Sequence, residues 1–315
     1  MMLCMALKQT FSRATAHKGR GHITRSSISR VMPNSDDRGS ATAAIPENMM
    51  ATAIRPGRMM VPKSAPAAAA SAKERGRRID RLKAACQRTV VEDVQPALAT
   101  VIAAAGGEEG DWSLRLDADD PDRQTLLFAY PARMPASARA YLRPVVRLEL
   151  GARSDHWPSA QAPITPYVAQ AFPAAFRAPA VAVKVLAVTR TFREKATLLH
   201  AEYHRSPAKP MPPRLSRHYY DLARLIVAGV GEQAVADLEL LQRVVDHKTV
   251  FFSSGWARYA EARRGSLRLM PASERTPALG ADYDSMREMF FGEHLAFPEV
   301  LRILEEWEGR FNRGA

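Results

Sequence analysis

The hydrophobic pattern of this chain changes twice along its 315 residues, and these changes constrain the fold more than any single motif does. Residues 1–70 show neither helical nor strand periodicity and run into the tract AAAASA. From Lys73 a helical pattern begins, short β-rich runs follow, and from Thr189 to the end the pattern is helical again. We therefore expect an α+β protein with three segments: a disordered or unrelated basic segment (1–70), a small α/β domain (71–188) and a helical domain (189–315).

Local spacing predicts the individual elements. In the α/β domain, apolar residues three to four positions apart predict a helix: Ile79, Leu82, Cys86, Val90 and Val94. We expect Pro96 to interrupt this helix and Gly106-Gly107 to close it. Strands are predicted at 125–130, 145–150 and 181–188, with loops such as 117–122 and 154–158 between them. In the helical domain, helices are predicted at 189–204, 216–228, 232–247, 285–291 and 298–310, with a broken region around 251–277.

The net charge of +12 suggests a polyanionic partner, provided that the charge lies on the folded part of the chain. Residues 1–63 hold ten Lys and Arg against three Asp and Glu, whereas the remaining residues hold 35 against 30. Most of the excess is therefore a property of the N-terminal segment. One minor hypothesis is that this segment binds nucleic acid nonspecifically.

The two cysteines, Cys4 and Cys86, cannot form a disulfide framework or a cysteine-based metal site, which fits a reducing cytoplasm. No apolar stretch approaches the roughly 18 residues that cross a bilayer, so we expect no membrane partner. Residues 1–34 contain no acidic residue and superficially resemble a mitochondrial transit peptide, but low-complexity coding or a misassigned start is the favoured interpretation. We expect a cytoplasmic protein.

The helices predicted at 189–204 and 216–228 carry the densest functional signal in the sequence. On the first, three residues are expected to face the core: Phe192, Ala196 and Leu199. Three others are expected to lie off that face: Arg190, Glu194 and Lys195. A purely structural interpretation also stands, because Arg190–Glu194 and Arg217–Asp221 have the spacing of ordinary i,i+4 ion pairs.

Three histidines gather in the same region: His200, His204 and His218. His200 and His204 are four residues apart, as a helical metal site requires, but Glu202 stands one position later than in the zinc-protease motif H-E-x-x-H. That shift turns the carboxylate about 100° around the helix. We therefore expect polar or RNA-facing histidines in preference to a zinc site.

Four runs carry a resemblance to a known family: PVVRLELGARSDHWP, VKVLAVTRTFREKATLLHAEYHR, SRHYYDLARL and RVVDHKTVFFSSGWARY. From about residue 73 to 313 the chain resembles the AbiEii/AbiGii nucleotidyltransferase toxins of bacterial toxin–antitoxin and abortive-infection systems. The resemblance implies a partial nucleotidyltransferase-like mixed sheet with flanking helices, followed by a C-terminal helical domain. It also implies Mg²⁺-dependent transfer of a nucleotide from a nucleoside triphosphate to RNA, with the tRNA 3′ end as acceptor in some members. A cognate antitoxin is the implied protein partner.

In that family, the Lys of the REK-type helix and the Asp of the R-x-x-Y-D-L helix belong to the active site, which points to Lys195 and Asp221 here. A lysine supplies a compact cation for a triphosphate, and an aspartate could position the lysine or the acceptor. Glu149, on the run VVRLEL, could bind metal or could be an ordinary solvated strand residue. Arg190 and Arg217 could assist in binding phosphate.

The chain departs from the family pattern before Lys73, where a Gly-rich turn and a strand bearing two metal-binding aspartates spaced D-x-D are expected. Asp36-Asp37 is an adjacent pair, which a strand would send to opposite faces. Asp117 and Asp119 have the right spacing but lie in a predicted loop, so neither pair is expected to replace the motif. One hypothesis is therefore a nucleotidyltransferase-type toxin whose N-terminal catalytic portion is lost or replaced, through a frameshift or a wrong gene start. The alternative is a catalytically inactive remnant that only binds the antitoxin or RNA.

Overall fold

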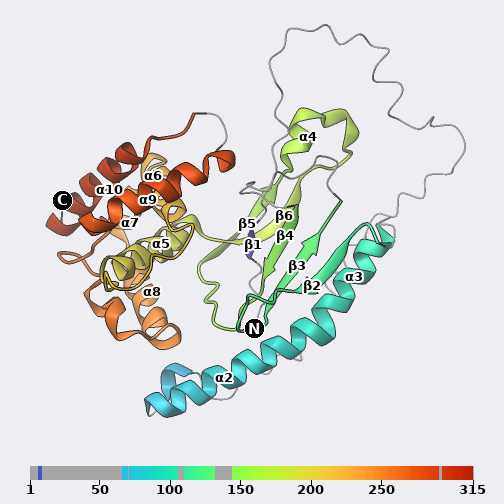
Figure 1. Cartoon of the computed structure of the whole chain (residues 1–315), viewed down its shortest axis with the longest axis horizontal. Coiled ribbons are helices and arrows are strands. Elements are labelled where there is room, and N and C mark those ends of the chain that lie inside the picture. The colour runs from blue at the N-terminus through green and yellow to red at the C-terminus, as the bar shows by residue number, and fades with distance from the viewer. Residues whose placement is uncertain are drawn as a thin grey trace, which may run out of the picture. The chain divides into compact units, whose positions relative to one another are not determined.

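The computed structural model describes residues 6–8, 66–69, 71–105, 110–131, 144–290 and 293–314 (Figure 1). The chain divides into two compact units, and each is described by itself. Unit 1 consists of residues 1–6, 59–86 and 150–315, and unit 2 consists of residues 7–58 and 87–149. Of the segment expected at 1–70, only 6–8 and 66–69 belong to the described residues. Within the described ranges, no helix is both long and apolar enough to span a membrane.

Unit 2 contains a sheet in the order β1–β4–β3–β2. Its strands are β1 (Ala6–Lys8), β2 (Ser113–Leu116), β3 (Thr125–Ala129) and β4 (Val145–Glu149). β3 pairs with both β2 and β4 in antiparallel ladders, so the buried Leu126 lies opposite Leu116 on one side and Leu148 on the other. The strands predicted at 125–130 and 145–150 are thus confirmed. β2 is an additional strand, too short and too polar to predict from SLRL alone.

The helix predicted before this sheet is longer than expected and is not interrupted at Pro96. α2 (Ala72–Thr89) continues through a π-helical turn (Val90–Val94) into α3 (Gln95–Ala104), as Figure 1 shows. In the wide turn, the backbone N–H of Gln95 donates to the carbonyl of Val90, five residues back. In a regular α-helix a proline ring clashes with the carbonyl four residues before it, and the wider turn makes room for the Pro96 ring. Gly106-Gly107, expected to close the helix, lies outside the described residues.

The part of unit 1 that follows residue 150 begins with a two-stranded antiparallel hairpin. β5 (Ser159–Ile164) pairs with β6 (Val181–Leu186), from Ser159 opposite Leu186 to Ile164 opposite Val181. The connection carries the short helix α4 (Tyr167–Ala171), which lies at the tip of the hairpin in Figure 1. The strand predicted at 181–188 is confirmed, whereas β5 was not predicted because Pro163 and small residues weaken the strand signal.

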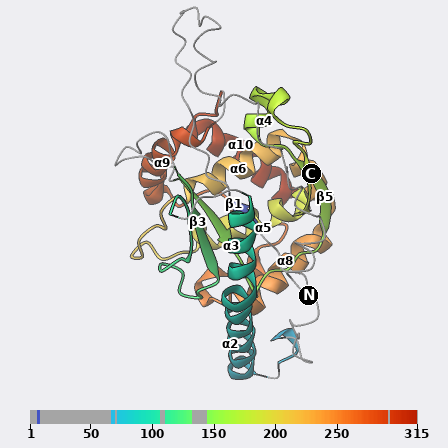
Figure 2. The ribbon, with the colours of Figure 1, turned by 90° about the vertical axis from the view of Figure 1, so that its right-hand side faces the viewer.

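The rest of unit 1 is helical, and the α+β class is confirmed. Its helices are α5 (Val188–Tyr203), α6 (Ser216–Val227), α7 (Val230–Ala236), α8 (Leu238–Phe251), α9 (Thr276–Ser285) and α10 (Phe297–Arg313). α10 lies beside α6 in both views (Figures 1 and 2). The Trp307 ring packs against Phe192 and Phe311, with ring centroids 5.0 Å apart in each pair. The expected core face of α5 is confirmed, because Phe192, Ala196 and Leu199 are fully buried.

Two helix predictions are wrong in detail. The single helix predicted at 232–247 is two helices, because Asp237 interrupts it: its Oδ1 accepts a hydrogen bond of 2.9 Å from the N–H of Leu240 and caps α8. The helix predicted at 285–291 is a short 3₁₀ turn (Arg287–Met289), and the regular helix of this region is α9, which precedes it. The helices predicted at 189–204, 216–228 and 298–310 are confirmed as α5, α6 and α10.

Candidate functional site

Lys195 and Asp221 meet between two neighbouring helices of unit 1. The Nζ of Lys195 on α5 donates a hydrogen bond of 2.6 Å to the Oδ2 of Asp221 on α6. The next residue on each helix, Ala196 on α5 and Leu222 on α6, is fully buried, so the two charged side chains lie at the margin of the buried face. The Lys195 side chain is 20% exposed and the Asp221 side chain 44%, and the pair is therefore open to a ligand.

Arg217 lies one turn before Asp221 on α6 and is half-buried. The i,i+4 pair with Asp221, which the spacing allowed, is not formed, because Asp221 bonds Lys195 instead. Among the residues that the structure describes, none accepts a hydrogen bond from Arg217 or forms an ion pair with it. Its guanidinium donors are therefore available to an anion beside the Lys195–Asp221 pair.

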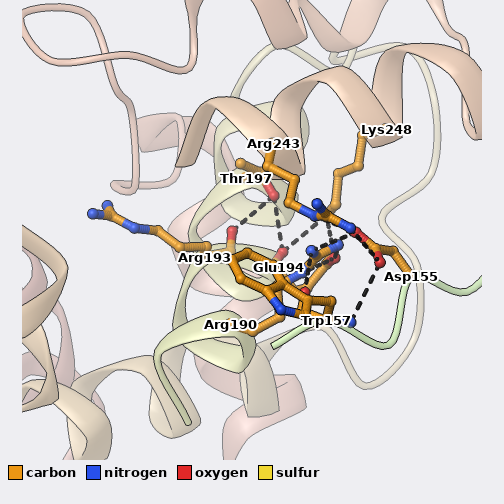
Figure 3. Close-up of polar contacts among 8 residues, drawn as sticks. All are labelled: Asp155, Trp157, Arg190, Arg193, Glu194, Thr197, Arg243 and Lys248. Carbon is orange, nitrogen blue, oxygen red and sulfur yellow. Dashed lines mark hydrogen bonds and ion pairs between the residues drawn. The ribbon is translucent and has the colours of Figure 1, made fainter. Parts of the chain in front are cut away.

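Arg190 has a different environment from the one expected. The prediction that it lies off the core face is wrong, because its side chain is completely buried. Its Nη1 donates to Asp155 Oδ2 at 2.8 Å and to the Trp157 carbonyl at 2.9 Å, and its Nε and Nη2 donate to Glu194 Oε1 at 3.0 and 2.7 Å (Figure 3). A direct phosphate contact would require these bonds to break. Arg190 therefore holds the 154–158 loop to α5.

The buried ion network extends from Arg190 to α8 (Figure 3). Lys248 Nζ donates to the Glu194 carbonyl at 2.9 Å and lies 3.2 Å from Glu194 Oε2, while Arg243 Nε donates to Asp155 at 2.9 Å. Burial raises the pKa of the Asp155 carboxyl, but hydrogen bonds from Arg243 and Arg190 outweigh burial and hold the pKa well below its ordinary value. Burial likewise opposes ionisation of Glu194, yet Lys248 and Arg190 lower its pKa overall. Because Glu194 immediately precedes Lys195, this network fixes the rotation of α5 and with it the direction of Lys195.

The three histidines do not form one polar cluster facing solvent. His200 is fully buried: its Nε2 contacts the Arg258 carbonyl at 3.1 Å and its Nδ1 the N–H of Arg268 at 3.1 Å. The expectation of a polar or RNA-facing His200 is therefore wrong, because the ring is a hydrogen-bonded core residue. His204 lies against it with ring centroids 4.8 Å apart.

Glu149 lies in unit 2, at the end of β4, and its carboxylate is paired. Arg147 Nε donates to Glu149 Oε1 at 3.0 Å, and Arg147 Nη2 lies 2.8 Å from Asp117 Oδ2. The other Asp117 oxygen accepts the N–H of Asp119 at 3.1 Å, as in a turn. Arg147 thus neutralises two carboxylates that would otherwise attract a cation.

The described residues do not fit a magnesium site of the implied kind. Nowhere in the described ranges do three or more His, Cys, Asp or Glu residues converge as metal ligands would. Mg²⁺ needs several oxygen ligands at close range, and the carboxylates of Glu149 and Asp117 are occupied by Arg147. Asp36-Asp37 lies outside the described residues.

The buried network was missed in the sequence because its parts are far apart there. Asp155 stands 35 residues before Arg190, and Arg243 stands 88 residues after Asp155. An i,i+4 Arg–Glu pair on a helix does not reveal whether a loop covers it, and a loop aspartate does not reveal its partner. The sequence offered one indication of the network: the Arg190–Glu194 pair lies on α5, the helix that carries Lys195.

Comparison with known proteins agrees with the family predicted from the sequence. A sequence model described as nucleotidyl transferase AbiEii toxin, type IV toxin–antitoxin system, matches residues 67–306. Neither the curated proteins nor the solved structures give a match. The matched range contains Lys195, Asp221 and Arg217, together with the buried network that orients α5. The chain therefore belongs to the AbiEii family of nucleotidyl transferase toxins of type IV toxin–antitoxin systems.

Proposed function

We propose that this chain transfers a nucleotide from a nucleoside triphosphate to RNA, with a tRNA 3′ end as the acceptor, and that Lys195 and Asp221 form its phosphate-handling centre. One observation carries the proposal: the Lys195–Asp221 pair joins α5 and α6 with its charged groups only partly covered. An ion pair that served stability alone would contribute little at this exposure. A cation held in place by a carboxylate suits a triphosphate, whose charge it compensates.

Each residue has a separate role in this proposal. Lys195 contacts the triphosphate as a point charge, and Arg217 supplies a planar set of donors next to it. Asp221 keeps the ammonium in place before the nucleotide arrives and faces the incoming acceptor hydroxyl afterwards. Arg190 acts only as a positioning residue, because its donors are engaged with Asp155, Glu194 and Trp157. The family implies a requirement for Mg²⁺, and the dependence of the transfer rate on Mg²⁺ concentration measures it.

The test is incubation of the purified full chain with each labelled nucleoside triphosphate, total tRNA and a range of Mg²⁺ concentrations. Wild type should label tRNA, and Lys195→Met and Asp221→Asn should each reduce the initial rate at least tenfold. Arg310→Met is the matched control, because Arg310 also forms an exposed ion pair between two helices, 2.7 Å from Glu232. Label that persists undiminished in both site variants would overturn the proposed roles.

A second candidate function is binding without catalysis, to the cognate antitoxin or to RNA. It is favoured by the pairing of Glu149 and Asp117 with Arg147, which leaves the described residues without a carboxylate cluster. Wild type that labels no RNA under any condition, yet co-purifies with the antitoxin or binds tRNA, would favour this candidate. Labelled tRNA would exclude it.

A further inference from the structure

Arginine and aromatic side chains gather at the C-terminal end of α5, away from the Lys195–Asp221 pair. The guanidinium of Arg205 lies 4.4 Å from the centroid of the Trp256 ring, and that of Arg268 lies 5.9 Å from the centroid of the Tyr203 ring. Arg258 belongs to the same region, because its carbonyl and the N–H of Arg268 both bond to the ring of His200, three residues before Tyr203 on α5. We call these residues the arginine–aromatic patch: Tyr203, Arg205, Trp256, Arg258 and Arg268.

A buried histidine holds the two loops of this patch. The N–H of Arg268 donates to His200 Nδ1, so that nitrogen carries no proton and the proton resides on Nε2. His200 Nε2 then donates to the Arg258 carbonyl at 3.1 Å. Burial lowers the pKa of His200 to about 4, so the ring stays neutral and keeps both hydrogen bonds near neutral pH. One side chain on α5 thus sets the positions of both Arg258 and Arg268.

The backbone at Arg258 is strained. Its φ is +44°, in the left-handed region that residues with a Cβ seldom adopt. Such a conformation persists only where the surroundings impose it, and it is concentrated at functional sites. Here the His200 hydrogen bond and the Glu261 N–H, which donates to the same carbonyl at 2.8 Å, impose it.

Two of the three arginines of the patch remain largely available to a ligand, whereas Arg205 is 19% exposed and donates to both carboxylate oxygens of Glu202 at 2.6 and 2.7 Å. Arg258 is 3.7 Å from Glu261 and Arg268 is 3.6 Å from Glu308, both long contacts, and their side chains are 56% and 49% exposed. A guanidinium can bind phosphate through two donors while its plane stacks on a ring. Tyr203 is itself 37% exposed. Basic donors beside a partly exposed aromatic ring suit the recognition of unpaired nucleotides.

We propose that the arginine–aromatic patch binds single-stranded RNA, with phosphates on Arg258 and Arg268 and an unstacked base on Tyr203. This inference rests on the proposed function, because the RNA it names is the acceptor. Tyr203 stands eight residues after Lys195 on α5, about 12 Å along the helix axis. RNA bound at the patch would extend about this distance towards the N-terminal end of α5 to bring its end to the Lys195–Asp221 pair.

The test is equilibrium binding of a short fluorescent single-stranded oligoribonucleotide to the full chain, at several salt concentrations and without nucleotide or Mg²⁺. The double variant Arg258→Gln/Arg268→Gln should bind roughly tenfold more weakly, with a salt slope smaller by about 2. Tyr203→Ala should lose roughly fivefold or more, and Tyr203→Phe, which keeps the ring, should bind like wild type. Thermal unfolding of each variant separates loss of binding from loss of folding.

The matched control is Arg302→Gln/Arg310→Gln on α10, which removes the same charge from arginines that are 54% and 44% exposed and also paired with glutamates. An equal loss of RNA affinity in this control would overturn the proposal, because the overall positive charge would then explain the binding. Wild type that binds no RNA, or that binds blunt duplex RNA as tightly as single strands, would also overturn it. The binding assay contains no nucleotide and is read separately from transfer of label to tRNA, so a failure of nucleotide transfer and a failure of the patch are distinguishable.

Discussion

At the scale of single residues, similar sequence spacing conceals different surroundings. Arg190 and Arg217 each stand four residues before a carboxylate on a helix. Arg190 is completely buried with its donors on Asp155, Glu194 and Trp157, whereas Arg217 is half-buried and has no such partner among the described residues. The first arginine therefore contributes to stability and orientation, and the second is available for a ligand.

Arg190→Met should destabilise the protein strongly, because it leaves Asp155 and Glu194 short of a partner in a buried network. Breaking a buried ion pair costs about 3–5 kcal/mol, whereas removal of an exposed pair costs at most about 1 kcal/mol. Urea unfolding of wild type, Arg190→Met and Arg310→Met measures the loss in the free energy of unfolding for each variant. Equal free energies of unfolding for the two variants would refute a stabilising role for the network.

Gly231 on α7 is required by a close approach of Trp307. A Cβ at this position would lie 2.7 Å from Trp307 Nε1, which is well inside van der Waals contact. Gly231→Ala should therefore lower the free energy of unfolding by about 1–3 kcal/mol. Gly76→Ala is the control: it is also helical but has no atom within 4 Å of the added Cβ, and should stabilise by about 0.5–1 kcal/mol. The opposite order of the two variants would contradict this packing.

The histidines and carboxyls predict that acid destabilises the protein in two steps. Burial is the main cause that lowers the pKa of His200 to about 4, so between about pH 6.5 and 4 the unfolded chain binds more protons than the folded one. Stability that is present above about pH 6.5 is therefore lost as the pH falls towards 4. The lowered pKa values of Asp155 and Glu194 have the same sign and act as the pH falls through about 4 and below. Urea unfolding at a series of pH values across this range measures the two losses of stability. His200→Gln should reduce the loss between about pH 6.5 and 4. An increase in stability on acidification would contradict the prediction.

At the scale of elements, α6 depends on a cap from another helix. Asp282 on α9 accepts hydrogen bonds from the N–H groups of Arg214 and Ser216, both at 2.8 Å, and from Ser216 Oγ at 2.6 Å. These bonds satisfy donors at the first turn of the helix that carries Asp221. Arg214 has a left-handed backbone with φ of +61°, and the Asp282 contact holds it there.

Asp282→Ala should therefore destabilise the protein by about 1–2 kcal/mol and loosen the start of α6. Amide hydrogen exchange should accelerate most at residues 214–219, with a smaller effect on α10. Asp284→Ala is the control, because Asp284 makes only an exposed contact of 3.8 Å with Arg287. Uniform acceleration throughout unit 1 would show that Asp282 supports the whole unit instead of this helix.

Elements with strong periodicity were predictable, and elements set by long-range contacts were not. Local apolar patterns, each only a few residues long, predicted these elements correctly. They are the strands β3, β4 and β6 and the helices α5, α6 and α10. The break at Asp237 and the π-helical turn before Pro96 depend on local hydrogen bonds that spacing does not encode. Family resemblance pointed to Lys195 and Asp221 as site residues. Neither periodicity nor resemblance predicted the Arg190 network, because Asp155 and Arg243 are distant in the chain.

At the scale of the whole molecule, the positive charge and the candidate site occupy different parts of the chain. Residues 1–63 hold ten Lys and Arg against three Asp and Glu, but the family match covers residues 67–306. The Lys195–Asp221 pair and the arginine–aromatic patch both fall inside that match. Recognition of RNA and nucleotide is therefore expected to depend on a few placed side chains more than on the overall charge of +12.

Equilibrium binding of each nucleoside triphosphate to the full chain, by isothermal titration calorimetry, tests the phosphate site most directly, because it does not require turnover. Lys195→Met should weaken the binding of the preferred nucleotide about tenfold or more, since a charge-assisted contact contributes about 1.5–3 kcal/mol. Arg310→Met, with the same loss of charge at an ion pair on α10, should bind within about twofold of wild type. Unchanged affinity in Lys195→Met, or equal losses in the two variants, would contradict a phosphate site at Lys195 and Asp221.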